Sequence, residues 1–520
     1  MLDHDICYRA VQSRDARFDG MFFTAVRTTH IYCRPSCAAR TPLRANVRFY
    51  KTAAAAQQAG YRACKRCRPD ATPNSPEWNA RADLVGRAMR LIADGVVDRD
   101  GVSGLARRLS YSPRQLNRQL MAELGAGPQS LAQAQRSRTA RILLETTDRP
   151  MTDVAFGAGF RSIRQFNDTI RLVYGCTPSE VRSRVRGRED VAADSAAGVI
   201  RLRLPYRPPL DFAALLRFLA ARAVPGVEEC TEDTYRRVLS LPHQLAVVAL
   251  RLPRRTSGAK ATASSYIECE IWLQDLRDLT AAVQRCRRLL DLDADPGAVA
   301  EALGRDRHLG PLVRANPGRR LPGHVDEHEL AVRAVLGQQV SIGAARLLAA
   351  KLAARYGEPL ARPDGSLTHA FPTAAALNAG APLEIGMPKA RQRALGALVA
   401  ALADGSLQLD GGADRDRVSA KLQELPGIGP WTVAYIRMRS LADPDAFLET
   451  DLGLRQAMAR LGLPTDVHAV TALAERWRPW RAYALQHLWA LGEGALASGP
   501  SAGQHLEAAA PSVPIFRAER

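Results

Sequence analysis

The stretch that decides the fold of the N-terminal region reads Cys33-Arg34-Pro35-Ser36-Cys37, followed after 26 residues by Cys64-Lys65-Arg66-Cys67. Two short cysteine pairs separated by the length of a small domain are typical of a four-sulfur zinc site. A region of this kind folds around its metal. The spacing alone favours a structural zinc knot and leaves a chemical role for the sulfurs open.

The 520-residue chain carries a strong and uneven positive charge. Its net charge is +19. Residues 1–190 contain 32 Lys and Arg against 18 Asp and Glu, a net +14, and the remaining 330 residues contain 40 against 35, a net +5. A chain with one strongly basic portion is predicted to bind nucleic acid, with a solvated arginine-rich surface as the alternative.

Hydropathy and cysteine usage favour a cytoplasmic protein that does not enter a membrane. No apolar run reaches membrane-spanning length, and the acidic, polar N-terminus is unlike a secretory signal. In the cytosol, the nine cysteines are expected to be ligands or buried thiols rather than disulfides.

Two polar breaks, at residues 69–76 and 186–197, divide the chain by composition. Apolar alternation predicts strands, and apolar residues at helical spacing predict helices. Strands are expected near residues 20–27, 46–50, 200–204, 245–252 and 267–273. Helices are expected through residues 82–92 and 131–144 and from Asp326 onward. Turns at Gly357, Gly386 and Pro426–Pro430 interrupt the last helical part. The fold class is therefore multidomain α+β. The expected divisions are 1–73, 77–186, a linker at 187–197, 198–315, 316–496 and a loose tail at 497–520.

The basic helical segment contains one pattern twice. Gly104–Leu109 is followed by a turn and a polar helix, for which Ser112 is the expected N-cap and Pro113 the first helical residue. Met151–Phe160 is followed in the same way by a second polar helix. Two short helices of this kind are typical of a helix-turn-helix unit, and two copies are a stronger signal than one.

This pair resembles the AraC-type DNA-binding domain, on the text Gly159–Phe166 and Thr177–Ser179. The resemblance implies two recognition helices, Pro113–Met121 and Ser162–Val173, in adjacent major grooves. The DNA contacts expected from these helices are Arg114, Gln115, Arg118, Arg164 and Gln165.

The cysteine region resembles the N-terminal zinc domain of Ada-type DNA repair proteins, on Phe22–Arg27, Ile31–Cys37 and Tyr61–Asp70. The resemblance implies one Zn²⁺ bound by Cys33, Cys37, Cys64 and Cys67, and Cys33 as the acceptor of a methyl group from methylphosphotriesters in DNA. It also makes three residues candidates for phosphate contacts, each of which fits a solvated or structural residue as well: Thr29, Arg40 and Arg62.

Methyl transfer to such a sulfur is chemically reasonable. A metal keeps its cysteines as thiolates, and the thiolate is the nucleophile. Four thiolates on Zn²⁺ leave the centre doubly negative, and the neutral phosphotriester loses its methyl group to become a stable anion. The thioether product is stable, so each site reacts once. Methylation makes the centre singly negative, which reduces its repulsion from DNA phosphates and predicts tighter promoter binding.

A second chemical signal is the text Leu425–Tyr435, which contains Gly427-Ile428-Gly429. Two glycines around one apolar residue predict a tight hairpin whose backbone N–H groups face a DNA phosphate. Asp451 lies 22 residues after Gly429. Without the hairpin, Thr450 or Asp451 would be expected simply to cap the helix that begins at Leu452.

With Leu336–Ser341 and Trp477–Trp489, this text resembles the helix-hairpin-helix glycosylases of the AlkA (3-methyladenine II) class, and residues 198–310 resemble its small sheet domain. The resemblance implies that Asp451 is the catalytic carboxylate, which stabilises a cation-like sugar or helps a water attack. It implies that the base is flipped out into an aromatic pocket that prefers cationic bases. The residues expected to line the pocket are Trp431, Tyr435 and Trp489. The residues expected to contact the DNA are Gln339, Gly427 and Gly429.

The chain is thus expected to be a fusion that repairs alkylated DNA and regulates genes. Cys33 would accept methyl groups and switch on transcription, and the C-terminal part would hydrolyse the glycosidic bond of alkylated purines such as 3-methyladenine. The expected partners are double-stranded DNA, both alkylated and as a promoter operator, and RNA polymerase, with the protein a monomer. The alternatives are a non-enzymatic zinc-dependent regulator with an inactive glycosylase-like module, and a repair protein without regulation.

Overall fold

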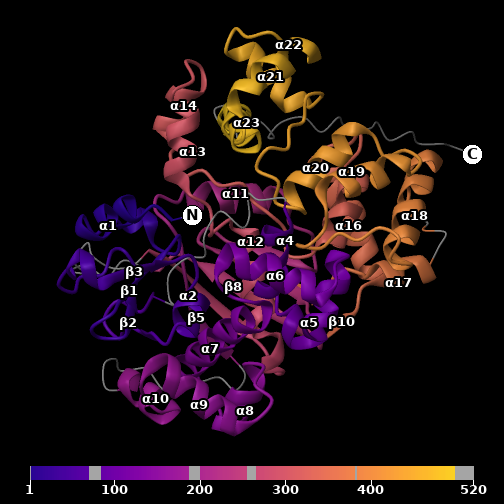
Figure 1. The fold of residues 1–520 in the computed structure, drawn as a ribbon. Coiled ribbons are helices and arrows are strands. Elements are labelled where there is room, and N and C mark those ends of the chain that lie inside the picture. Colours follow the sequence, from indigo (N-terminus) through magenta and orange to yellow (C-terminus); the bar gives the residue numbers. More distant parts are fainter. Residues whose placement is uncertain are drawn as a thin grey trace, which may run out of the picture.

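The computed structural model of the chain describes residues 2–69, 83–186, 199–253, 265–380, 383 and 385–497. The expected linker at 187–197 and all but the first residue of the expected tail lie outside these residues. Figure 1 shows the N-terminal region and helices α8 to α10 on one side of the molecule, and the C-terminal helices on the other. No described helix is both long and apolar enough to cross a membrane.

The N-terminal region is a small four-stranded sheet with flanking helices. Its elements are α1 (His4–Gln12), β1 (Phe23–Val26), β2 (Ile31–Cys33), β3 (Val47–Tyr50), α2 (Ala53–Gln58) and β4 (Arg62–Ala63). The strand order is β3-β1-β2-β4, and β2 pairs with β4 in parallel, Tyr32 opposite Ala63. Because parallel strands end at the same edge, Cys33 at the end of β2 is brought beside Cys64, the residue after β4.

The basic segment is entirely helical where it is described. Its helices are α4 (Leu84–Ala93), α5 (Val96–Leu109), α6 (Pro113–Leu124), α7 (Pro128–Thr146), α8 (Met151–Gly157), α9 (Ile163–Tyr174) and α10 (Pro178–Arg186). Helix α6 begins with Ser112 as N-cap and Pro113 at the first position, as predicted. The pairs α5–α6 and α8–α9 form two helix-turn-helix units joined by α7, which confirms the expected arrangement.

The third region is built on a five-stranded antiparallel sheet in the order β5-β9-β8-β7-β6. Its elements are β5 (Val199–Pro205), α11 (Phe212–Arg222), β6 (Glu228–Cys230), β7 (Thr234–Ser240), β8 (Leu245–Arg251), β9 (Tyr266–Trp272) and α12 (Leu279–Leu289). Three strands were expected from apolar alternation. The sequence did not reveal β6 and β7, because their buried faces include Glu228 and Arg237, which pair with each other at 3.2 Å.

The C-terminal region is mainly helical. It contains α13 (Pro296–Leu303), α14 (Leu309–Ala315), α15 (Glu327–Leu336), α16 (Ile342–Tyr356), α17 (Ala374–Ala379), α18 (Lys389–Ala403), α19 (Arg415–Glu424), α20 (Pro430–Arg439), α21 (Leu452–Arg460), α22 (Val467–Ala474) and α23 (Arg481–Ala497). The expectation of helix onward from Asp326 is wrong for one hairpin, β10 (Pro359–Asp364) and β11 (Leu367–His369). This hairpin is stabilised by tertiary contacts, since Thr368 N–H donates to Gly226 O at 2.8 Å and Asp364 pairs with Arg236.

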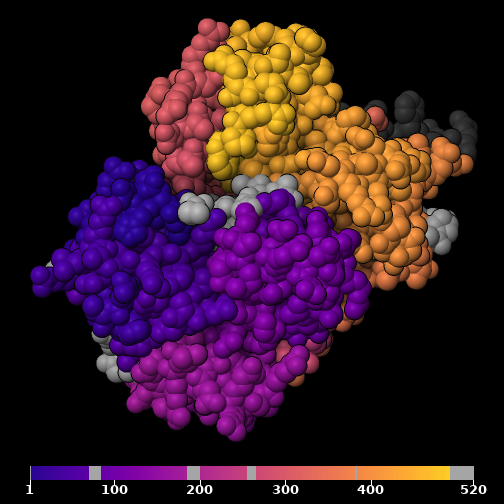
Figure 2. Space-filling model, in the orientation of Figure 1, coloured from indigo at the N-terminus to yellow at the C-terminus, as the bar shows by residue number. Residues whose placement is uncertain are grey.

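The regions pack against one another rather than being strung along the chain. One buried apolar cluster includes Tyr32 of the N-terminal sheet, Phe166 of α9 and Leu250 of β8. Between α4 and the segment before α19, the Arg87 Nε–H donates to Gly412 O at 2.5 Å. Figure 2 shows the purple surface of the basic helical segment directly beside the orange surface of the C-terminal region.

Candidate functional sites

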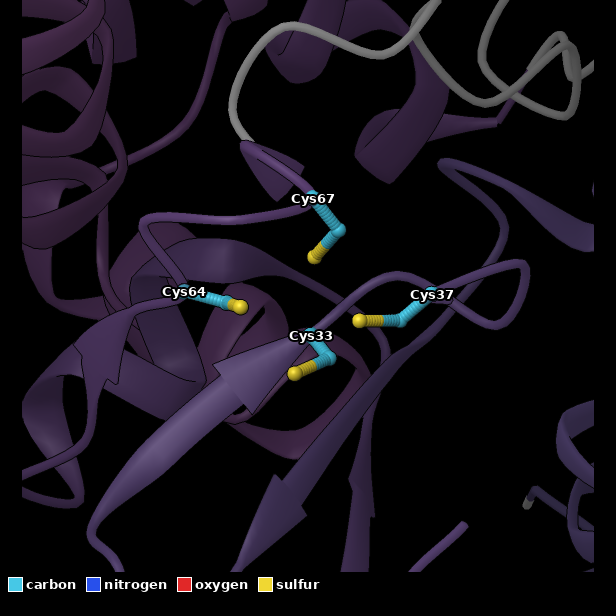
Figure 3. A group of neighbouring side chains, drawn as sticks. All are labelled: Cys33, Cys37, Cys64 and Cys67. Carbon is cyan, nitrogen blue, oxygen red and sulfur yellow. The ribbon is translucent and has the colours of Figure 1, made fainter. Parts of the chain in front are cut away.

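The four predicted metal ligands come together at the edge of the N-terminal sheet. The sulfur atoms of Cys33, Cys37, Cys64 and Cys67 all lie within 4.8 Å of one another. Figure 3 shows the four side chains pointing toward a common centre. Tetrahedral zinc with Zn–S bonds of about 2.3 Å needs sulfurs about 3.8 Å apart, so the cluster suits one Zn²⁺.

The loop between the first two ligands is held by a carboxylate that the sequence did not single out. Asp19 is buried, and it accepts hydrogen bonds from the Ser36 N–H at 3.0 Å and the Ser36 hydroxyl at 2.6 Å. It also pairs with Arg34 at 3.3 Å. Burial raises the pKa of Asp19, and the bonds from Ser36 oppose that rise. This contact fixes the spacing between Cys33 and Cys37.

The four cysteines differ in exposure. As residues, Cys64 and Cys67 are buried, and Cys33 and Cys37 are partly exposed. Hydrogen bonds among the crowded sulfurs raise the pKa of Cys33, whose thiol donates, and lower the pKa of Cys64, whose sulfur accepts. A single cation replaces those protons in a zinc site. Cys33 therefore combines ligand geometry with a place in the partly exposed half of the cluster, which it shares with Cys37.

Of the three predicted phosphate contacts in this region, two are exposed. Thr29 lies in the turn between β1 and β2, and Arg40 lies in the loop after Cys37. Arg62 is half-buried against the end of α9, because a Cβ atom on Gly175 would lie 3.2 Å from Arg62 Cδ. Arg62 thus contacts the second helix-turn-helix unit.

The predicted contacts on the recognition helices fall into two groups. Arg114, Arg118 and Arg164 are exposed on α6 and α9. Gln115 and Gln165 instead use their side-chain oxygens at the helix starts, accepting from Ser112 N–H at 3.2 Å and Arg161 N–H at 3.3 Å. The Ser-x-x-Gln text of a capping box was present in the sequence and was missed. Only the amide nitrogens of these glutamines are free of the cap.

In the C-terminal region, Asp451 caps a helix and also faces two tryptophans. Its Oδ1 accepts the Leu454 N–H at 2.8 Å, so it is the N-cap of α21. The same oxygen accepts the indole N–H of Trp489 at 2.8 Å, and Oδ2 accepts that of Trp431 at 3.0 Å. Asp451 therefore caps a helix, which is the alternative to a catalytic role, and it also lies between two of the predicted pocket aromatics.

Two of the predicted aromatic residues contact this carboxylate, and the third stacks on one of them. Trp431 stacks on Tyr435 with ring centroids 5.1 Å apart and planes 9° apart. Trp489 approaches from α23, and Gly453 allows it, since a Cβ atom there would lie 3.2 Å from Trp489 Cδ1. The role of Gly453 was not visible in the sequence, because it depends on how α23 packs on α21.

The predicted hairpin precedes α20. Gly427 has φ of +75°, and Gly429 is the N-cap of α20 without any side-chain cap. A Cβ atom on Gly429 would meet nothing within 4 Å, and a helix start without a side-chain cap leaves backbone N–H groups that suit a phosphate. Gln338 braces the hairpin by donating to Gly427 O at 3.0 Å. Gln339 is exposed beside it, with φ of +55°.

Comparison with known protein families agrees with these regions. The chain matches the metal binding domain of Ada over residues 6–70, a helix-turn-helix domain over 105–184 and the AlkA N-terminal domain over 201–326. These matches confirm the resemblances seen in the sequence.

Three curated relatives extend the comparison. The probable bifunctional transcriptional activator/DNA repair enzyme AlkA of Mycobacterium tuberculosis is 56% identical over 94% of this chain and 96% of its own. The DNA-3-methyladenine glycosylase 2 of Escherichia coli is 37% identical over 55% of this chain and 95% of its own. The bifunctional transcriptional activator/DNA repair enzyme Ada of E. coli is 36% identical over 37% of this chain and 51% of its own. The chain is thus a fusion of an Ada zinc domain, a helix-turn-helix domain and an AlkA glycosylase, and it belongs to the family of bifunctional transcriptional activator/DNA repair enzymes AlkA.

Proposed function

We propose that this protein repairs alkylated DNA at two separate centres and activates transcription in response to the damage. Cys33 accepts the methyl group of DNA methylphosphotriesters, and the pocket at Asp451 releases alkylated purines such as 3-methyladenine. The observation that carries the proposal is the presence, in one chain, of a four-sulfur cluster with Cys33 partly exposed and a carboxylate held between two indoles beside a helix-hairpin-helix.

At the N-terminal centre, the sulfur of the partly exposed Cys33 attacks the methyl carbon in line with the departing phosphate oxygen. A zinc ion bound by Cys33, Cys37, Cys64 and Cys67 keeps these sulfurs as thiolates. The S–C bond forms as the C–O bond breaks, and the electron pair leaves with the phosphodiester anion. Asp19 holds the Cys33–Cys37 loop in place during the reaction.

At the C-terminal centre, an alkylated purine that carries a positive charge leaves as a neutral base. The sugar left behind is cation-like, and Asp451 stabilises it. Three N–H donors, from Trp431, Trp489 and Leu454, fix the position of the carboxylate before the charge develops. A charge placed in advance needs no reorganisation during the reaction.

Gene regulation and location complete the proposal. Exposed Arg114, Arg118 and Arg164 support binding of α6 and α9 to a promoter operator, with Gln115 and Gln165 contributing their amide nitrogens. Thr29, Arg40 and the hairpin before α20 contact phosphates, Gln339 contacts the DNA, and RNA polymerase is the partner at the promoter. The protein acts as a cytoplasmic monomer with the domain divisions given above.

The rival function is a regulator whose glycosylase half is inert. Release of free 3-methyladenine from methylated duplex DNA distinguishes the two. The native protein is expected to release the base. The Asp451→Asn variant is expected to lose base release but keep methyl uptake. The Cys33→Ala variant is expected to lose methyl uptake but keep base release. Absence of release by the native protein would favour the rival.

A further inference from the structure

Behind the aromatic wall of the glycosylase pocket lies a buried arginine, Arg439, the last residue of α20. It is 3% exposed. Its Nη1 donates to the Tyr435 hydroxyl at 2.9 Å and its Nη2 to Gly323 O at 2.9 Å, while its Nε has no hydrogen-bond partner. Among the residues that the structure describes, no carboxylate forms an ion pair with Arg439.

This lack of a counter-ion distinguishes Arg439 from its buried neighbours. Arg237 pairs with Glu329 at 2.7 Å, and Arg333 pairs with Glu228 at 2.9 Å. Arg439 instead lies against aromatic rings, 4.8 Å from the centroid of Phe218 and 5.7 Å from that of Tyr435. A buried cation balanced only by rings, a hydroxyl and a carbonyl keeps most of its field.

A chain of contacts joins Arg439 to the Asp451 carboxylate through the aromatic residues of the pocket. The Tyr435 ring is stacked on Trp431, and Trp431 donates to the Asp451 carboxylate. Burial by itself would raise the pKa of Tyr435, but the positive charges of Arg439, Arg222 and Arg333 outweigh it and lower that pKa. The positive potential therefore reaches the ring that backs Trp431.

The positive charge of Arg439 repels a cationic base bound on the other side of the aromatic residues and so weakens its binding. The face of an indole attracts cations through its quadrupole. Two unit charges ~12 Å apart at an effective dielectric near 20 change an equilibrium by about tenfold. A neutral base on the same face is not affected in this way.

We propose that Arg439 is a specificity-determining residue, which weakens the preference of the pocket for cationic over neutral bases. This inference rests on the proposed glycosylase function. It assigns part of the charge discrimination of the pocket to a residue that does not touch the substrate.

The test compares two bases of one shape and different charge in the full-length protein. One duplex carries 2′-fluoro-7-methylguanine, a cationic base whose fluorine prevents excision, and the other carries the neutral isostere 7-methyl-7-deazaguanine. The quantity measured is the ratio of the two dissociation constants. We expect Arg439→Gln to shift this ratio about three- to tenfold toward the cationic base, and Arg439→Lys, which keeps the charge, to leave it within about twofold.

The control is Arg415→Gln, which removes a buried arginine of α19 that lies 3.5 Å from Asp443, and it should not change the ratio. An equal shift in the Gln and Lys variants, or no shift in either, would overturn the proposal. If Arg439→Gln does not fold, as judged by methyl uptake at Cys33 and thermal unfolding, Arg439→Met tests the same loss of charge. Failure of the native protein to prefer either lesion over undamaged DNA, with no base released, would instead refute the glycosylase function.

Discussion

The two reaction centres of this protein hold negative charge in different ways. Four sulfurs within 4.8 Å of one another repel each other as thiolates and need a cation to coexist. The single carboxylate of Asp451 is held by neutral donors, two indoles and one backbone N–H. On the proposed function, the first centre depends on a bound metal and is used up by its product, whereas the second belongs to the fold itself and is available for repeated turnover.

The sharpest separation of the two centres is expected from Cys33→Ala. It removes the only sulfur that we assign to methyl uptake, so the uptake should disappear completely, while release of 3-methyladenine stays unchanged. Intact-protein mass spectrometry and chromatography of the released base measure both. The matched control is Cys230→Ala, a thiol outside the cluster, which should lose neither activity. Residual methylation of Cys33→Ala at another residue would contradict the assignment.

The converse variant is Asp451→Asn. It keeps the helix cap but removes the charge that faces the sugar, and we expect excision to fall about 10²- to 10³-fold, as for the loss of one preorganised electrostatic group. Single-turnover rates on methylated duplex DNA measure this loss. Asp466→Asn, a change at the N-cap of α22, is the control for capping alone. A fall of equal size in that control would assign the effect to stability.

Methylation itself should connect the N-terminal centre to DNA binding. Loss of one negative charge at ~8 Å from a phosphate, at an effective dielectric near 20, corresponds to about 2 kcal/mol or roughly thirtyfold in affinity. Binding to the promoter is measured before and after methyl uptake at one salt concentration. Equal affinities would separate repair from regulation and favour a repair protein without a switch.

The smallest effect should come from one of the donors to the carboxylate. Trp489→Phe keeps an aromatic ring but removes one N–H to Asp451, and a hydrogen bond to a charged group is worth about 1.5–3 kcal/mol. Allowing for the two remaining donors, we expect excision to slow about tenfold. Trp480→Phe, which leaves the Asp451 donors in place, is the control. Equal rates in both variants would mean that the indole does not position the carboxylate.

The same contrast explains what the sequence could predict. The zinc ligands lie in two short motifs, and the parallel pairing of β2 with β4 needs to join only neighbouring segments, so the spacing predicts the cluster. The Asp451 site joins α20, α21 and α23, and its indole donors depend on how these helices pack. The sequence predicts which residues belong to the Asp451 site. The role of Gly453 and the orientation of Trp489 depend on the packing of the helices and are visible only in the structure.

Other features have local physical causes. Ser-x-x-Gln describes a capping box as well as a DNA-contacting text, and the structure shows the full box at Ser112 and Gln115, while Gln165 accepts the Arg161 N–H one residue earlier. The β10–β11 hairpin has no clear sequence signal because it is stabilised by tertiary contacts with β7 and its neighbours. The unpaired charge of Arg439 has no sequence signal, since only packing decides which arginines meet a carboxylate.

The most direct test of two independently held charges is one reaction mixture with both substrates. Zinc-loaded and chelator-treated protein are given a methylphosphotriester duplex and a 3-methyladenine duplex, and protein mass and free base are followed together. We predict that chelation abolishes the added methyl group, that zinc restores it, and that base release changes by less than about threefold. Parallel loss of both activities on chelation, or methyl uptake without metal, would contradict the account.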